Sequence, residues 1–283
     1  MEKQLLVDKV ALAATAVLLV SPLLAYLTGL WLPYWKLVTA LGYEEAYVAL
    51  AVVIFVAVSP QLGYYTLLSL LTSAWLNVYL KNALAMPRPP PEQWKVPEEG
   101  YGFPSGHAQT STAFWSAACL AVRRLALAAF SAVLVALISV SRLELGVHYP
   151  RDVVGGVLIG LAVSLATYYA AERLLRADKR KASLAVLLYS LLVALLYGVQ
   201  PDPTIVKVAG VLAGSSAYPL LRDRVKPASS LAWRAALSLL ALAIAMALTR
   251  AAKAAPPPLQ FAAYLAVAVT IISTPLIHRQ ART

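Results

Sequence analysis

Long apolar stretches are the feature that most constrains what this chain can fold into. A helix needs about 20 apolar residues to cross the hydrocarbon core of a bilayer. Backbone polar groups in lipid must be satisfied internally, which favours helices. The sequence therefore predicts an all-α, polytopic membrane helix bundle with about ten spans, near residues 10–31, 43–60, 63–86, 107–122, 125–142, 151–171, 183–199, 204–221, 229–249 and 258–277.

The composition excludes most soluble folds. Of the 283 residues, 60% are hydrophobic and only 13% are charged, whereas a soluble globular chain has about 25% charged residues. The chain is therefore too poor in charge to build an ordinary polar shell. Cys119 is the only cysteine, so neither an intramolecular disulfide nor a cysteine metal cluster can form.

The basic residues, which give a formal net charge of +11, fall mostly at the ends of apolar runs. This placement is a topology signal, because Lys and Arg accumulate in short cytoplasmic loops, and it argues against a nucleic-acid partner. The first apolar run is too long for a signal peptide and is expected to remain as an anchor. We expect a multi-pass cell-membrane protein with both termini cytoplasmic. The predicted inner loops then hold Arg123, Arg124, Arg173, Arg176, Lys179, Arg180, Lys181, Arg222, Arg224 and Lys226.

Three clusters of polar residues lie where predicted spans meet the outer face. Polar groups at membrane depth or at helix mouths are candidates for function, because burying them in lipid is costly. The first cluster is at the end of the third predicted span, the second leads into the fourth, and the third joins the fifth to the sixth. Their main members are Lys81 and Arg88, then Ser105, Gly106 and His107, then Arg142, His148 and Asp152.

The residue types in these clusters suit phosphoryl chemistry. Three cations around one point favour a phosphate group, and the free N–H groups of a helix start strengthen that preference. His148 and Asp152 are four residues apart and share a face if a helix begins near His148. A carboxylate on one imidazole nitrogen would make the other a better nucleophile. His107, from a different helix, can face the leaving oxygen.

The three clusters read KNALAMPRP at 81–89, PSGH at 104–107 and SRLELGVHYPRD at 141–152. They resemble the signature of the type-2 phosphatidic acid phosphatase superfamily, K-x6-R-P, P-S-G-H and S-R-x5-H-x3-D, with every fixed position present. The resemblance covers about residues 10–175. Matching three strings in order and at the right spacing greatly lowers the false-positive risk of a short motif.

The resemblance implies a role for each matched residue. His148 resembles the nucleophile that becomes a phosphohistidine, Asp152 its orienting partner, and His107 the general acid. The phosphate-binding residues are implied to be Lys81, Arg88, Ser105, Gly106 and Arg142. No metal and no other cofactor is implied, because the cations neutralise the phosphate.

The resemblance also implies an organisation and a function. We expect a six-helix membrane phosphatase core over 1–175 and a four-helix membrane extension of unknown role over 183–283. The expected substrate is a membrane lipid phosphate or diphosphate of the isoprenoid diphosphate, phosphatidate or phosphatidylglycerophosphate class, hydrolysed at the outer face. The alternatives are a sugar-phosphate phosphatase of glucose-6-phosphatase type, a lipid phosphotransferase, or a transporter or scaffold with a vestigial site.

Other residues receive structural interpretations. Two pairs of glycines at four-residue spacing, Gly156 with Gly160 and Gly210 with Gly214, predict close helix packing. Three acids near the motifs are expected to face solvent, three tryptophans to lie in the interfacial belt, and His278 to be a surface residue. These acids and tryptophans are Glu98, Glu99, Glu144, Trp31, Trp35 and Trp94.

Overall fold

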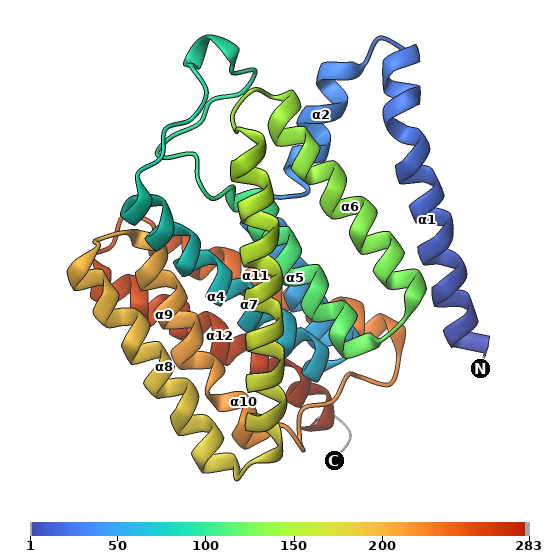
Figure 1. The fold of residues 1–283 in the computed structure, drawn as a ribbon. Coiled ribbons are helices and arrows are strands. Elements are labelled where there is room, and N and C mark those ends of the chain that lie inside the picture. The colour runs from blue at the N-terminus through green and yellow to red at the C-terminus, as the bar shows by residue number, and fades with distance from the viewer. Residues whose placement is uncertain (1, 281–283) are drawn as a thin grey trace. The chain divides into compact units, whose positions relative to one another are not determined.

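The computed structural model describes the backbone of residues 2–280 and the side chains of residues 5–277. Over this range the chain is helical and forms no strand, which confirms the all-α prediction (Figure 1). The helices are α1 Glu2–Leu27, α2 Trp31–Ala40, α3 Glu44–Val53, η1 Ile54–Val58 (a π-helix), α4 Pro60–Leu84, η2 Pro91–Gln93 (3₁₀), α5 Gly106–Val122, α6 Leu125–Glu144, α7 Pro150–Arg176, α8 Lys179–Val199, α9 Pro203–Ser215, α10 Ala217–Leu221, α11 Leu231–Ala251 and α12 Pro257–Gln280.

Each of the ten predicted segments coincides over most of its length with one or more of these helices. The sequence did not predict α2. Its ten residues are too few to cross a bilayer, so a criterion based on span length passes over it. Together α2 and the run Glu44–Val58 form a pair bent by 53°, which is either one broken span or a re-entrant segment.

Seven helical segments of the described residues are long and apolar enough to cross a membrane, or eight if the bent pair is one span. This is fewer than the ten predicted. The helix α5 has only 17 residues, and α4 is rich in hydroxyl and amide side chains. Thr66, Ser69 and Ser73 of α4 are buried, so these polar groups face protein and α4 has less need of an apolar surface.

The chain divides into two compact units. The first consists of Met1–Tyr47 and Tyr79–Ala166. In it α1, α2 and α5 each pack against α6, and α1 runs beside α6 in Figure 1. The second consists of Val48–Val78 and Thr167–Thr283. The predicted division into a phosphatase core, 1–175, and an extension, 183–283, describes which part of the chain holds the candidate site residues. It is not the same as the division into compact units, and it stays a prediction.

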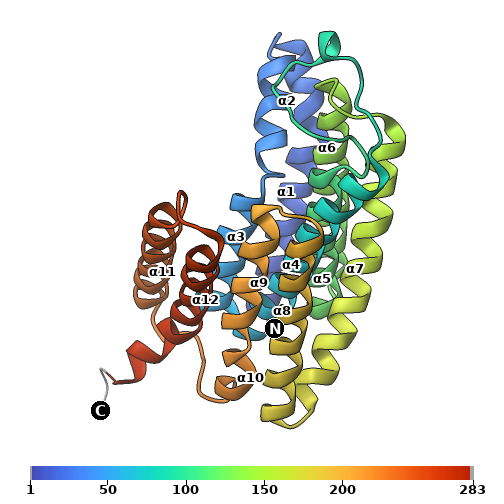
Figure 2. The ribbon, with the colours of Figure 1, turned by 90° about the vertical axis from the view of Figure 1, so that its left-hand side faces the viewer.

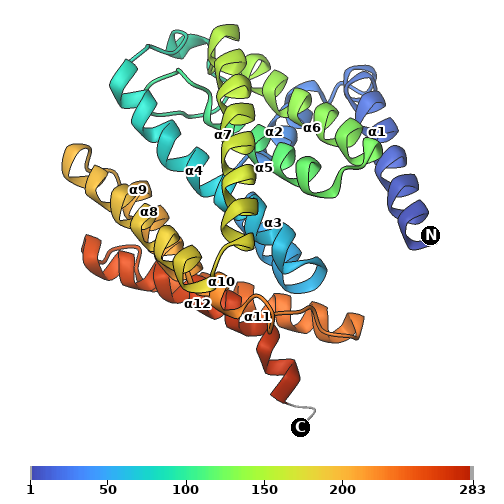
Figure 3. The same cartoon turned by 60° about the horizontal axis from the view of Figure 1, so that its bottom comes forward.

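In the second unit α9 packs against both α8 and α12, and α11 packs against α12 (Figures 2 and 3). The glycines of α9 allow this approach. A Cβ on Gly210 would lie 2.5 Å from the carbonyl oxygen of Phe261, and one on Gly214 would also meet the α12 backbone. The predicted close packing of this glycine pair is confirmed.

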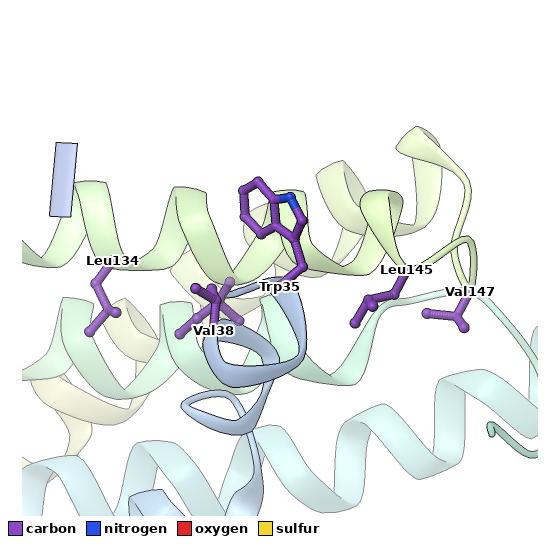
Figure 4. Close-up of a cluster of buried hydrophobic side chains, with 6 residues drawn as sticks. Trp35, Val38, Leu134, Leu145 and Val147 are labelled. Carbon is purple, nitrogen blue, oxygen red and sulfur yellow. The ribbon is translucent and has the colours of Figure 1, made fainter. Parts of the chain in front are cut away.

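A buried apolar cluster connects α2 to α6 in the first unit (Figure 4). It contains Trp35, Val38, Leu134, Ile138, Leu145 and Val147. Trp35 is only 3% exposed, so its expected place in an interfacial belt is wrong. Its ring packs edge-on against Trp31 with ring centroids 5.2 Å apart, and aromatic pairs favour such edge-to-face contacts. This cluster holds α6 and the turn after it, from which the third motif extends.

Candidate active site

The third motif begins at the end of α6 and continues into the first turn of α7. Gly146, between the two helices, has a φ of +73°, a backbone conformation that glycine adopts readily. His148 Nδ1 lies 3.4 Å from Asp152 Oδ2, which also accepts a hydrogen bond of 2.9 Å from the Tyr149 N–H. Both His148 and Asp152 are buried. The predicted pairing is therefore present, and it leaves His148 Nε2 as the nitrogen available for chemistry.

Arg88 of the first motif reaches this nitrogen. Its Nη1 lies 3.0 Å from His148 Nε2 and donates to the carbonyl oxygen of Val147 at 3.0 Å. The Arg88 side chain is only 6% exposed. The structure thus brings the first and third motifs together at the predicted nucleophile.

Arg142 lies in the last turn of α6, and its side chain is 1% exposed. Its Nη1 donates to Thr39 Oγ1 at 2.7 Å, and its Nη2 pairs with Glu98 Oε1. The other oxygen of Glu98 lies 3.2 Å from Nη2 of Arg88. One carboxylate therefore connects the two arginines that the motifs assign to phosphate.

Ser105 is the N-cap residue of α5 and joins the second motif to the third. Its N–H donates to the carbonyl oxygen of Asp152 at 2.9 Å, while its side chain makes no capping hydrogen bond. The buried Ser105 Oγ has no hydrogen-bond partner within the described part of the chain. An unpaired buried hydroxyl is costly, so its position is better explained by binding than by stability. Gly106 follows as the first residue of α5.

His107 lies in the first turn of α5 with its ring against the segment that follows α2. The ring centroids of His107 and Tyr43 are 5.2 Å apart in an edge-on arrangement. A Cβ on Gly42 would lie 2.7 Å from His107 Cδ2, so only glycine permits this approach. The buried Nε2 of His107 makes no hydrogen bond to any described residue and is free to contact a bound group.

Lys81, near the end of α4, completes the predicted set. Its Nζ donates to the carbonyl oxygen of Tyr101 at 2.5 Å. The charges of Arg88, Arg142 and Asp152 act on this ammonium group. The charge of Lys81 also acts on His148, together with the charges of Arg88 and Arg142.

Two glycines of α7 bring that helix against the start of α5. A Cβ on Gly156 would lie 2.7 Å from the carbonyl oxygen of Ser105, and one on Gly160 would lie 2.5 Å from that of Gln109. The predicted close packing of this pair is confirmed. Here the contact fixes Ser105 beside the helix that carries Asp152.

The surroundings of His148 favour its neutral form. Burial is the largest influence and the positive charges of Arg88 and Arg142 act in the same direction; together they outweigh Asp152 and lower the pKa of His148 to about 4. Burial also lowers the pKa of Arg88. A neutral imidazole keeps its lone pair on Nε2 near pH 7, as a nucleophile requires.

A family comparison matches the part of the chain that carries the three motifs. Residues 62–176 match the model of the PAP2 superfamily. The match confirms the predicted resemblance to this superfamily over residues 62–176, and it supports a phosphatase. All eight predicted site residues lie inside this PAP2 region.

One solved structure is similar to part of the chain. It is the crystal structure of the first transmembrane PAP2 type phosphatidylglycerolphosphate phosphatase from Bacillus subtilis, with 24% sequence identity and a TM-score of 0.44. The similarity covers 59% of this chain and 87% of that one. No curated protein matches the chain.

Sequence reasoning missed several residues that contact the predicted site residues. Glu98 was expected to face solvent, but its side chain is 19% exposed and joins two arginines. Thr39 and Gly42 precede the matched range and belong to no motif. Glu144 accepts a hydrogen bond of 3.1 Å from Trp31 Nε1, so it too is not a simple solvent-facing acid. Glu99 is exposed, as expected.

Within the described residues, no group of three or more His, Cys, Asp or Glu side chains is arranged to hold a metal ion. The charges of Lys81, Arg88 and Arg142 act on the paired His148, and Nε of Arg151 lies 3.7 Å from Oδ1 of Asp152. The side chain of His278 lies outside the described residues.

Proposed function

We propose that this protein is an integral membrane phosphatase that hydrolyses lipid phosphates or diphosphates through a phosphohistidine, without a metal ion. The observation that carries the proposal is the environment of His148. Its Nδ1 faces a buried carboxylate, and its Nε2 lies 3.0 Å from the guanidinium of Arg88. A nucleophile oriented on one side and placed against a phosphate-binding cation on the other suits attack on phosphorus.

In the first step Nε2 of His148 forms a bond to phosphorus as the bond from phosphorus to the leaving oxygen breaks. Protonated His107 gives its proton to that oxygen. The phosphorylated imidazole carries a positive charge, which the carboxylate of Asp152 stabilises. His107 lies in the first turn of α5 and His148 in the connection between α6 and α7. Two separate elements thus supply the attacking and the protonating group, as displacement in line requires, because attack and departure take place on opposite sides of phosphorus.

In the second step a water molecule replaces His148. His107, now neutral, removes a proton from the water as its oxygen bonds to phosphorus and the bond from phosphorus to nitrogen breaks. Inorganic phosphate leaves, and both histidines return to their starting protonation states. The same residue thus serves as acid and then as base, as microscopic reversibility requires.

The remaining residues would bind the phosphoryl oxygens. Lys81, Arg88 and Arg142 supply positive charge, and the Ser105 hydroxyl and the Gly106 N–H supply donors at the start of a helix. Ser105 Oγ and Arg142 Nε are buried without a partner among described residues, which supports such a role. Oriented donors of this kind act most strongly on the charge that develops in the transition state.

We place this site at the non-cytoplasmic face, with both termini cytoplasmic. The support is the concentration of Lys and Arg in the alternate loops, which marks the cytoplasmic side. A lipid substrate could then keep its chains in the bilayer while its phosphate enters between the helix ends. A tag at either terminus that was accessible to a membrane-impermeant label from outside intact cells would contradict this orientation.

The function is tested by phosphate release from purified protein in detergent, without added metal and with a chelator present. The panel contains an isoprenoid diphosphate, phosphatidate, phosphatidylglycerophosphate and glucose 6-phosphate. We expect release from at least one lipid and much less from the sugar phosphate. A preference for the sugar phosphate would reject the lipid assignment, and a strict requirement for magnesium would reject the mechanism.

A further inference from the structure

The segment Glu98–Tyr101, in the long connection between α4 and α5, contacts all three cations of the proposed phosphate site. Glu98 pairs with Arg88 and Arg142 through its two carboxylate oxygens. Arg88 also donates to the carbonyl oxygens of Glu99 and Gly100, at 2.9 and 3.1 Å. Lys81 donates to the carbonyl oxygen of Tyr101. Each of the three cations assigned to phosphate is therefore engaged by at least one oxygen of the chain itself, whereas the Ser105 hydroxyl and the Nε of Arg142 have no such partner among the described residues.

The geometry of the Glu98 contact is that of a substitute for phosphate. A carboxylate and a phosphate both present anionic oxygens that match the fork of a guanidinium group. Two buried cations side by side repel each other, and an anion between them offsets that repulsion. Glu98 supplies this anion, because its two oxygens reach two different arginines.

A substrate phosphate cannot pair fully with these arginines while the carboxylate of Glu98 stays between them. Two anionic groups competing for the same donors would also repel each other at short range. Binding of phosphate therefore requires the carboxylate to leave. Two residues of this segment do not hold it in the protein interior by a side chain. Gly100 has no side chain and a φ of +64°, and Glu99 is exposed.

Resting on the proposed function, we propose that Glu98 is a displaceable internal anion that occupies the phosphate site between turnovers and is exchanged for the substrate phosphate. The exchange selects for charge: a phosphate or diphosphate bearing two or more negative charges can replace the carboxylate, whereas a singly charged ester competes poorly. The apparent affinity for every anion is lowered by the fraction of molecules in which Glu98 occupies the site.

The test is the substitution Glu98→Gln, which removes the charge and keeps the shape. We expect about a tenfold fall in both the KM for lipid phosphate and the inhibition constant for inorganic phosphate, with kcat little changed. A carboxylate that instead positions the arginines would give the opposite result, a higher KM and a lower kcat. Unchanged or raised constants would overturn the proposal. Glu92→Gln is the matched control, because Glu92 is an exposed acid of the same connection and its loss should leave both constants unchanged.

A second measurement uses the wild-type protein and needs no turnover. Amide hydrogen exchange of the peptide covering residues 95–102 should increase when inorganic phosphate is added, because the displaced segment loses its contacts. Slower or unaltered exchange at a phosphate concentration that stabilises the protein against heat would overturn the proposal. If the protein binds phosphate and the segment opens but no substrate is hydrolysed, the proposed function fails and the internal anion stands.

Discussion

Two pairs of glycines make the same kind of helix contact in the two units, with different consequences. On α7, Gly156 and Gly160 bring the helix against the start of α5, where a Cβ on Gly156 would lie 2.7 Å from the Ser105 carbonyl oxygen. On α9, Gly210 and Gly214 bring the helix against α12. The first contact lies one turn from Asp152 and fixes two motifs against each other, whereas the second joins helices that carry none of the motifs. The same sequence spacing therefore indicates close packing in both places, and only one of the two contacts lies beside the proposed site.

The largest expected loss of activity that distinguishes the α5–α7 contact region from the α9–α12 contact region is at Asp152. Asp152→Asn keeps the shape of the side chain but removes the charge that orients and stabilises His148. Loss of the orienting carboxylate in a histidine-dependent hydrolase costs about 10⁴-fold in kcat, and we expect a fall of about 10³-fold or more here. Steady-state phosphate release measures it, with the thermal unfolding midpoint as a check that the protein is folded. A variant with more than about a tenth of wild-type activity would show that Asp152 is not the orienting group.

A smaller effect is expected from a matched pair of glycine substitutions. Gly156→Ala places a Cβ against the Ser105 backbone and should displace the start of α5, and a displacement of about 1 Å at an active site can cost 10²-fold in rate. Gly210→Ala places a Cβ 2.5 Å from the Phe261 carbonyl oxygen and should lower the unfolding midpoint while leaving kcat of the folded protein nearly unchanged.

The pair is measured by kcat together with the unfolding midpoint of each variant. If both substitutions lowered kcat equally, the contrast between the two contacts would be lost. If neither lowered the midpoint, the backbones would have room that the structure does not show. Either result would contradict the assignment of a catalytic consequence to the first contact and a purely structural one to the second.

The smallest expected effect is on the pH dependence of kcat/KM. The lowered pKa of His148, about 4, means that its imidazole stays neutral and nucleophilic as the pH falls below the ordinary histidine value of about 6.5. After correction for ionisation of the substrate, the step on the acid side of kcat/KM that belongs to His148 should lie near pH 4. A step near 6.5 would indicate that burial and the neighbouring arginines do not act on this histidine as the structure suggests. In Arg88→Gln, which removes one of those charges, the step should move to higher pH.

The sequence predicted the helical class, the positions of ten helical segments and the residues of the three motifs, because apolar length and fixed spacing are local properties. It did not predict α2, which is too short for a criterion based on span length. It also missed Glu98 and Thr39, whose partners are distant along the chain: Arg142 is 44 positions from one and 103 from the other. An acid in a proline-rich connection looks solvent-exposed until the arginines that it meets are located in space.

Trp35 shows the same limit in the apolar part of the chain. A tryptophan near a predicted membrane boundary resembles an interfacial residue, and only the packing of α2 on α6 shows that it is buried. The glycine pairs were predicted correctly as contacts, because close approach depends on the absence of a side chain. The spacing alone does not show which helix each glycine pair meets. It therefore could not show that only the contact of Gly156 and Gly160 lies beside the proposed site.

The most direct test of the proposed mechanism is whether phosphorus becomes bonded to His148. Purified protein is mixed with a substrate that carries a labelled phosphate, quenched in alkali within milliseconds, and digested for mass spectrometry of the peptide that contains residue 148. We expect an acid-labile, alkali-stable phosphoryl group on His148, accumulating further when His107 is replaced by Ala and water is no longer activated, provided that the leaving group departs without protonation. His148→Ala should show neither the label nor phosphate release. Phosphate release at the wild-type rate by His148→Ala would contradict the account.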